Sequence, residues 1–155
     1  MNRCPTKEVD GNQCEERGET GVQRSGHGLG MKILYHDIVA NKHFEKKYLA
    51  KKVPLTTLLK QADFVTLHVP LLKSTHHLIG AKELKLMKKT AYLINTSRGA
   101  VVDEMALVKA LQRKQIAGAG LDVYESEPNK DHPLHKLNNC LLTPHTASAT
   151  REVRE

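Results

Sequence analysis

The sequence predicts an α/β fold built on one open parallel sheet with helices on both faces. Three observations support this prediction. Apolar runs of strand length alternate along the chain with amphipathic segments of helix length. The apolar runs are nearly continuous, as expected for strands that are buried on both faces. The chain has 155 residues, which is enough for one such domain with its own core.

The predicted strands are apolar, rich in branched side chains and bounded by Pro, Gly, Asn or Asp. The fourth of them, AGAGLDVY, carries small residues that let helices approach the sheet closely. The strands cover residues 31–37, 63–70, 90–97, 117–124 and 138–145.

The predicted helices lie between these strands and after the last of them. They cover residues 41–52, 55–62, 80–89, 102–114 and 149–155. The clearest is 102–114, where Asp103 is a good N-cap residue. Its inward face is predicted to consist of Met105, Leu107, Val108 and Leu111.

Residues 1–30 differ from the rest of the chain. They are rich in Glu, Arg, Gly, Asn and Gln and show almost no apolar periodicity. This composition predicts an irregular or flexible leader, with the folded domain in residues 31–155.

Composition excludes several classes of function. The net charge is +7, but the lysines are scattered through helical segments without interleaved aromatics, so no nucleic-acid partner is expected. Three cysteines without a CxxC pair favour reduced thiols in a cytoplasmic protein, and a zinc site from Cys4, Cys14 and His27 matches no standard ligand spacing. Because of that spacing, no metal is expected. No run resembles a signal peptide or approaches the ~20 residues of a membrane span, so no membrane partner is expected.

Reactive side chains collect where the predicted strands end. Ligands of open parallel sheets bind beyond the carboxyl ends of the strands, and these ends meet at one edge. The groups expected at this edge are Asp37, His68, Ser97, Arg98, Asp122, Glu125, Glu127 and His145.

Three of these residues together suit the reduction of a 2-keto acid. Arg98 could bind a substrate carboxylate through two parallel hydrogen bonds. His145 could pass a proton to the carbonyl oxygen, because an imidazole titrates near neutral pH. Glu127 could pair with His145 and orient its ring.

Three longer blocks carry a resemblance to a known family. NTSRGAVVDEMALVKAL, AGAGLDVYESEP and LLTPHTASAT resemble signature blocks of the D-isomer-specific 2-hydroxyacid dehydrogenases, from about Gly28 to the end of the chain. That family includes glyoxylate/hydroxypyruvate reductases and phosphoglycerate dehydrogenases. The resemblance implies a Rossmann-like doubly wound sheet, an oxidoreductase acting on a CH–OH group, and NAD as the cofactor.

The resemblance also implies roles for single residues. Arg98, Glu127 and His145 match the catalytic residues of the family, namely the substrate-binding arginine, the acid of the His–Glu pair and the acid/base. Asp37 matches the acid that binds the adenosine ribose and, with no arginine after it, favours NAD over NADP. The residues that match cofactor contacts are Asp37, Val69, Pro70, Thr96, Ser97, Arg98, Asp122 and His145.

The sequence departs from the family in two ways. The glycine-rich turn and the strand before it are not evident, and Gly26, Gly28 and Gly30 better fit a loose helix terminus than a phosphate cradle. We also expect no substrate domain in residues 1–155. We therefore expect a partial NAD-binding domain with weak or no activity alone, acting on a small 2-keto or 2-hydroxy acid and able to form a homodimer. The alternative is a non-catalytic NAD-binding or protein-interaction module.

Each assignment has a simpler alternative. Arg98 could pair with the Asp103–Glu104 turn, His145 could be an ordinary surface histidine, and Glu127 and Asp37 could be solvated loop acids. The remaining histidines near the strand ends, His68, His76 and His77, are not expected to be functional.

Overall fold

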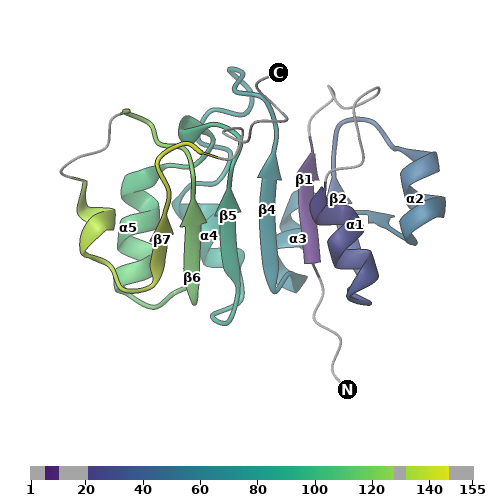
Figure 1. The fold of residues 1–155 in the computed structure, drawn as a ribbon, viewed down its shortest axis with the longest axis horizontal. Helices are drawn as coiled ribbons and strands as arrows, with labels where there is room; N and C mark the ends of the chain where they lie inside the picture. The colour runs from purple at the N-terminus through teal and green to yellow at the C-terminus, as the bar shows by residue number, and fades with distance from the viewer. Residues whose placement is uncertain (1–5, 11–20, 128–131, 147–155) are drawn as a thin grey trace.

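A computed structural model describes residues 6–10, 21–127 and 132–146 of the protein. Its core is a seven-stranded sheet in the order β3-β2-β1-β4-β5-β6-β7, in which every neighbouring pair is parallel. Figure 1 shows the strand arrows pointing the same way across the molecule. The strands are β1 (Thr6–Asp10), β2 (Ile33–His36), β3 (Lys51–Lys52), β4 (Phe64–His68), β5 (Tyr92–Asn95), β6 (Gly118–Leu121) and β7 (Cys140–Leu142).

Helices cover both faces of this sheet, which confirms the predicted fold class. Neighbours among α3, α4 and α5 contact each other and form one layer, and Figure 1 shows α3 and α4 behind the sheet with α1 in front of it. The α-helices are α1 (Gly21–Gly28), α2 (Lys42–Tyr48), α3 (Leu55–Gln61), α4 (Ala81–Leu86) and α5 (Glu104–Gln112), and two short 3₁₀ turns are η1 (Gly99–Val101) and η2 (Pro133–Lys136).

The prediction of an irregular leader is wrong for two stretches of residues 1–30. Thr6–Asp10 forms β1, which pairs with β2 on one side and β4 on the other, and Gly21–Gly28 forms α1. A strand therefore stands where the sequence led us to expect none. The two flanking strands supply backbone partners on both sides, so this position accepts a segment without apolar periodicity.

Two other predictions, the lack of a glycine-rich turn and a helix near the end of the chain, concern residues outside those described. A glycine-rich turn between β1 and α1 would lie in residues 11–20, where the sequence lacks the GxGxxG spacing. The helix predicted for residues 149–155 also lies outside them.

The helix predicted over residues 41–52 is shorter than expected. α2 ends at Tyr48 because Leu49 adopts a left-handed backbone with φ of 52°, and its N–H closes the helix on the Glu45 carbonyl. The chain then turns into β3 at the edge of the sheet. Periodicity alone could not reveal this stop, since a leucine rarely occupies such a conformation.

The core consists mainly of leucine, isoleucine and valine side chains between the sheet and the layer of α3, α4 and α5. Leu107, Val108 and Leu111 of α5 are buried as predicted, and Asp103 caps the helix by accepting from the Ala106 N–H. Met105 was assigned to the same face, but it is 51% exposed. At 3.6 residues per turn Met105 lies about 110° around the helix from the mean direction of Leu107, Val108 and Leu111, so this assignment was wrong.

Candidate functional site

The carboxyl ends of the strands meet at one edge of the sheet and carry the predicted site residues. Asp37 follows β2, and Val69 and Pro70 follow β4. Thr96, Ser97 and Arg98 follow β5, Asp122 follows β6, and His145 lies three residues beyond β7. Because all pairs are parallel, these side chains share one edge, as ligand-binding groups of open α/β sheets do.

Asn95, the last residue of β5, holds the turn that carries Arg98. Its side chain is buried, its Nδ2 donates to the Arg98 carbonyl at 3.0 Å, and its Oδ1 accepts from Ser97 N at 3.1 Å and Ser97 Oγ at 2.9 Å. Arg98 is exposed, and its Nη1 donates to the Ser97 carbonyl at 2.7 Å. Our sequence analysis missed Asn95, although a polar residue that closes an apolar strand is a signal for it.

Gly99 brings this turn against the segment that follows β6. A Cβ atom on Gly99 would lie 1.9 Å from the carbonyl carbon of Tyr124 and 2.4 Å from the backbone nitrogen of Glu125. Only a residue without a side chain permits this approach. The glycine therefore sets the spacing between the Arg98 turn and the loop that carries Glu127.

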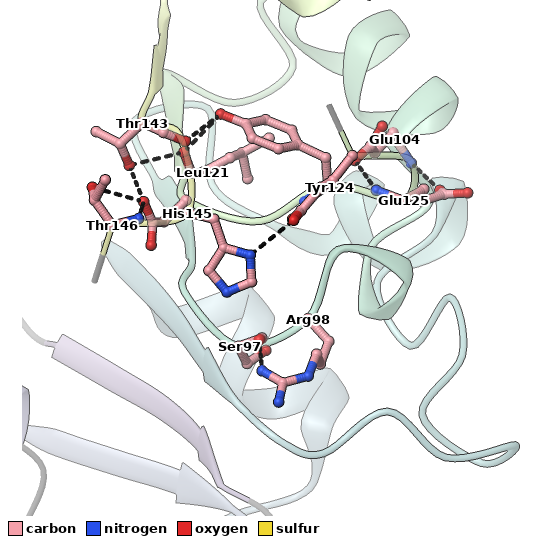
Figure 2. Close-up of polar contacts among 11 residues, drawn as sticks. Ser97, Arg98, Glu104, Leu121, Tyr124, Glu125, Thr143, His145 and Thr146 are labelled. Carbon is pink, nitrogen blue, oxygen red and sulfur yellow. Dashed lines mark hydrogen bonds and ion pairs between the residues drawn. The ribbon is translucent and has the colours of Figure 1, made fainter. Parts of the chain in front are cut away.

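His145 and Glu127 form a hydrogen-bonded pair at this edge (Figure 2). His145 Nδ1 lies 2.8 Å from Glu127 Oε2, and the second oxygen, Oε1, accepts from the Tyr124 N–H at 3.1 Å. The hydrogen bond with His145 is the main cause that lowers the pKa of the Glu127 carboxyl. Both side chains remain partly exposed, at 46% for His145 and 39% for Glu127.

The backbone of His145 is itself unusual. Its φ is 54°, a left-handed conformation that a non-glycine residue adopts rarely and that is often associated with functional sites. This turn directs the imidazole back toward the loop after β6, as Figure 2 shows.

Asp122 ties the ends of β6 and β7 together. It is buried, and its Oδ1 accepts from Thr143 Oγ1 at 2.5 Å and from the Thr146 N–H at 2.8 Å. Tyr124 adds a second link, because its hydroxyl donates to the Thr143 carbonyl at 2.8 Å. These threonines were not predicted, although hydroxyl residues on both sides of Pro144 and His145 are visible in the sequence. These hydrogen bonds hold the segment after β7, which carries His145, against the segment after β6.

The predicted residues thus fall into two groups. Figure 2 shows Arg98 on the turn below the His145 ring. Glu127, in the loop after β6, hydrogen-bonds the same ring. Asp37, Val69 and Pro70 lie instead at the ends of β2 and β4, on either side of β1. Asp37 is half-buried, and its Oδ1 accepts from the Val39 N–H at 3.2 Å, which shapes the turn after β2.

The other histidines near the edge have protein partners. His68 Nε2 lies 2.9 Å from Thr66 Oγ1, and burial lowers the pKa of the His68 imidazole. His76 and His77 stack with ring centroids 4.0 Å apart. Within residues 21–127 and 132–146 no cluster of His, Cys, Asp and Glu has the makings of a metal site. None of the helices that the structure describes is long and apolar enough to cross a membrane.

The side chains at this edge suit a dinucleotide such as NAD. Carboxylates accept hydrogen bonds from ribose hydroxyls, and Asp37 presents one after β2. Val69, which is buried, and Pro70 are apolar residues at the end of β4, on the other side of β1 from Asp37. Asp122 adds a buried carboxylate near the pair of His145 and Glu127.

Comparison with protein families agrees with this geometry. Residues 18–147 match the family model described as D-isomer specific 2-hydroxyacid dehydrogenase, NAD binding domain. Among curated proteins, the chain is 54% identical over 134 residues to a glyoxylate reductase of Korarchaeum cryptofilum, covering 86% of this chain and 40% of that protein. It is 57% identical to a glyoxylate reductase of Thermococcus litoralis with the same coverage. The chain therefore spans about 40% of the length of these relatives.

Solved structures give the same result. The TT0316 protein of Thermus thermophilus matches with a TM-score of 0.86 and 40% identity, over 99% of this chain and 47% of that one. The NAD-complexed form of a D-isomer specific 2-hydroxyacid dehydrogenase of Lactobacillus delbrueckii ssp. bulgaricus matches with a TM-score of 0.80 and 38% identity, over 94% and 47% of the two chains.

Proposed function

Since the chain belongs to the D-isomer specific 2-hydroxyacid dehydrogenase family through its NAD-binding domain, we propose that it binds NAD(H) and carries the catalytic groups for reducing a small 2-keto acid to the 2-hydroxy acid. The observation that carries this proposal is the 2.8 Å hydrogen bond between His145 Nδ1 and Glu127 Oε2. It lies beside Arg98 at the edge where ligands of such sheets bind.

Arg98 binds the substrate carboxylate in this proposal. The Asn95 side chain holds the turn that carries it through hydrogen bonds to the Arg98 carbonyl and the Ser97 N–H. The Arg98 guanidinium is exposed, and besides the Nη1 donor that binds the Ser97 carbonyl it carries further N–H donors. Two parallel hydrogen bonds would hold the carboxylate and place the keto group toward His145. The relatives named glyoxylate reductase suggest glyoxylate as the first substrate to test.

His145 donates the proton. Its Nδ1 is engaged by Glu127, which leaves Nε2 to face the substrate carbonyl oxygen. The hydrogen bond to the Glu127 carboxylate fixes the orientation of the ring. NADH, when bound, supplies the hydride for the carbonyl carbon. The proton from His145 completes the hydroxyl group, and water returns a proton to the imidazole.

Asp37, Val69, Pro70, Thr96, Ser97 and Asp122 would hold the cofactor. Asp37 would accept from the ribose hydroxyls and, being anionic, would repel the 2′-phosphate of NADP. Asp122 would face the nicotinamide end, since it lies between the loop of Glu127 and the turn of His145.

The isolated chain should be a poor catalyst. It spans about 40% of the relatives it resembles, so any domain that closes over the site in them would lie elsewhere. Without closure, water reaches a pair that is already partly exposed. The same observation favours the second candidate, a non-catalytic NAD-binding or interaction module, which could pair as a homodimer.

The first test is a calorimetric titration of the purified chain with NADH, alongside Asp37→Ala. We expect micromolar binding that weakens by roughly tenfold to a hundredfold in the variant, because a charge-assisted hydrogen bond is worth about 1.5–3 kcal/mol. Asp63→Ala is the matched control, since Asp63 pairs with Lys88 near the start of β4, away from the site edge. Equal binding by wild type and Asp37→Ala would remove the assigned nucleotide site.

Turnover of glyoxylate with NADH then separates the two candidates. Any measured rate should fall by at least about a hundredfold in Arg98→Ala and in His145→Ala. If both variants kept the wild-type rate, the assigned mechanism would be wrong. NADH binding without any turnover would favour the binding module.

A further inference from the structure

Glu104, the first residue of α5, is a buried carboxylate outside the catalytic groups described above. The residue is only 5% exposed, and burial raises the pKa of its carboxyl. Its Oε1 accepts from the Glu125 N–H at 2.6 Å, and its Oε2 lies 3.2 Å from His132 Nε2. Burying a carboxyl group costs free energy of folding unless hydrogen-bond partners satisfy it. The contacts with Glu125 and His132 supply these partners.

Glu104 and Glu125 bind each other reciprocally. The Glu104 N–H donates to Glu125 Oε1 at 3.0 Å while the Glu104 carboxylate accepts from the Glu125 N–H, as Figure 2 shows. A carboxylate at the start of a helix is also favoured by the helix dipole. His77 Nε2 lies 3.1 Å from the same Glu125 oxygen, an ion-pair distance, although this buried nitrogen makes no hydrogen bond. These hydrogen bonds anchor the segment after β6 to the start of α5.

His132 extends the link to the start of η2. Its Nδ1 accepts from the Leu134 N–H at 3.3 Å, so its Nε2 carries the proton and donates toward Glu104. Glu125 and His132 stand on opposite sides of Glu127 in the sequence. Glu104 therefore holds the chain both before and after the residue that pairs with His145.

From these contacts we infer that Glu104 is a positioning residue for the Glu127–His145 pair. Glu104 fixes the backbone at Glu125, and Glu127 then closes onto the Tyr124 N–H through Oε1 and onto His145 through Oε2. Without the Glu104 side chain the segment would keep only the hydrogen bond from the Glu104 N–H to Glu125 Oε1, and the Glu127 carboxylate would contact the His145 ring for a smaller fraction of the time. The inference rests on the proposed function only in treating that pair as catalytic.

The test follows the Glu127 carboxyl itself by NMR. Glutamate is labelled with carbon-13 at its side-chain carboxyl, the purified chain is titrated with acid, and Glu127→Gln identifies the signal. In the wild type Glu127 titrates below its ordinary pKa of 4.5 because His145 holds its charged form. In Glu104→Ala the Glu127 pKa should rise toward 4.5, because the contact with His145 is lost.

Three further variants sharpen the result. Glu104→Asp keeps the charge but is one methylene shorter, so it should raise the Glu127 pKa as well and decides the question if Glu104→Ala does not fold. Glu104→Gln keeps an oxygen for the Glu125 N–H and should leave the Glu127 pKa near the wild-type value. Asp103→Ala removes the N-cap of the same helix without touching Glu125, and should also leave it unchanged.

An unchanged Glu127 pKa in folded Glu104→Ala or Glu104→Asp would overturn the inference. So would an equal rise in Asp103→Ala, because the effect would then come from loosening α5. The measurement needs neither NADH nor substrate. A failed NADH titration would therefore count against the proposed function and leave the positioning role of Glu104 standing on its own result.

Discussion

Replacing Gly99 with alanine should separate the two loops that carry Arg98 and Glu127. The added Cβ would lie 1.9 Å from the Tyr124 carbonyl carbon and 2.0 Å from its oxygen, whereas ordinary contact begins at 3.4 Å. The backbones must move apart by about 1.5 Å, since no flexible side chain is there to yield. The strain acts on the turn held by Asn95 and on the segment held by Glu104.

The expected loss is about 3 kcal/mol in the free energy of unfolding, the upper end of the range for overpacked sites, because the opposing atoms are backbone. A domain of this size typically has about 5–15 kcal/mol, so the variant should still fold. Its melting temperature should fall by roughly 10 °C, at about 2–4 °C per kcal/mol for a chain of this length.

Equilibrium unfolding in urea measures this loss, with Gly120→Ala as the matched control. A Cβ on Gly120 meets nothing within 4 Å, so that variant should be unchanged or more stable by about 0.5 kcal/mol. Gly99→Ala within about 0.5 kcal/mol of the wild type would refute the reasoning. It would mean that the two loops are free to separate and that Gly99 does not set their spacing.

Two further predictions concern ionisation. Burial raises the pKa of the Cys140 thiol from 9.0 to about 11, so its thiolate near pH 8 should be about a hundredfold scarcer than usual, and iodoacetamide should label Cys140 at least tenfold more slowly in the native chain than in urea. Equal rates by site-resolved mass spectrometry would contradict this. Because the folded pKa of Glu127 is lowered, its contribution to stability is present above its unfolded pKa and is lost as pH falls through the folded pKa. For so exposed a pair that contribution is at most about 0.5 kcal/mol, and the stability difference between wild type and Glu127→Gln should vanish once the pH is well below the folded pKa of Glu127. A difference that persists in acid would show that the glutamine changes something other than this ionisation.

The sequence predicted those features that depend on strand order and strand ends. Alternating apolar and amphipathic runs determine a parallel sheet, and a parallel sheet brings Arg98, Asp122 and His145 to one edge whatever their exact contacts. Asn95, Gly99 and Glu104 were missed as supports of the site because their roles depend on loops that meet across the fold. Nothing in the order of residues shows that position 99 touches Tyr124 or that position 104 touches Glu125.

The errors had a related cause. β1 is a strand because β2 and β4 pair with it on both sides, not because of its own apolar pattern. α2 ends at Tyr48 because the next residue, Leu49, has a left-handed backbone, a conformation that leucine rarely adopts. Met105 was placed on the buried face of α5 because it is apolar, although its angle around the helix points it toward solvent. In each case tertiary partners or exact geometry decided against the local signal.

The contacts that hold the proposed catalytic groups come from one half of the sheet. The Tyr124 N–H, the Asn95 side chain, the Asp122 carboxylate and Glu104 all belong to β5, β6, α5 or the loops that follow these strands. None of the contacts just named involves β1 or β2. It follows that the Glu127–His145 pair does not depend on the residues around Asp37, so a substitution there that weakens NADH binding should leave the pair intact. The NMR titration of Glu127 and the NADH titration therefore measure two separable halves of one site.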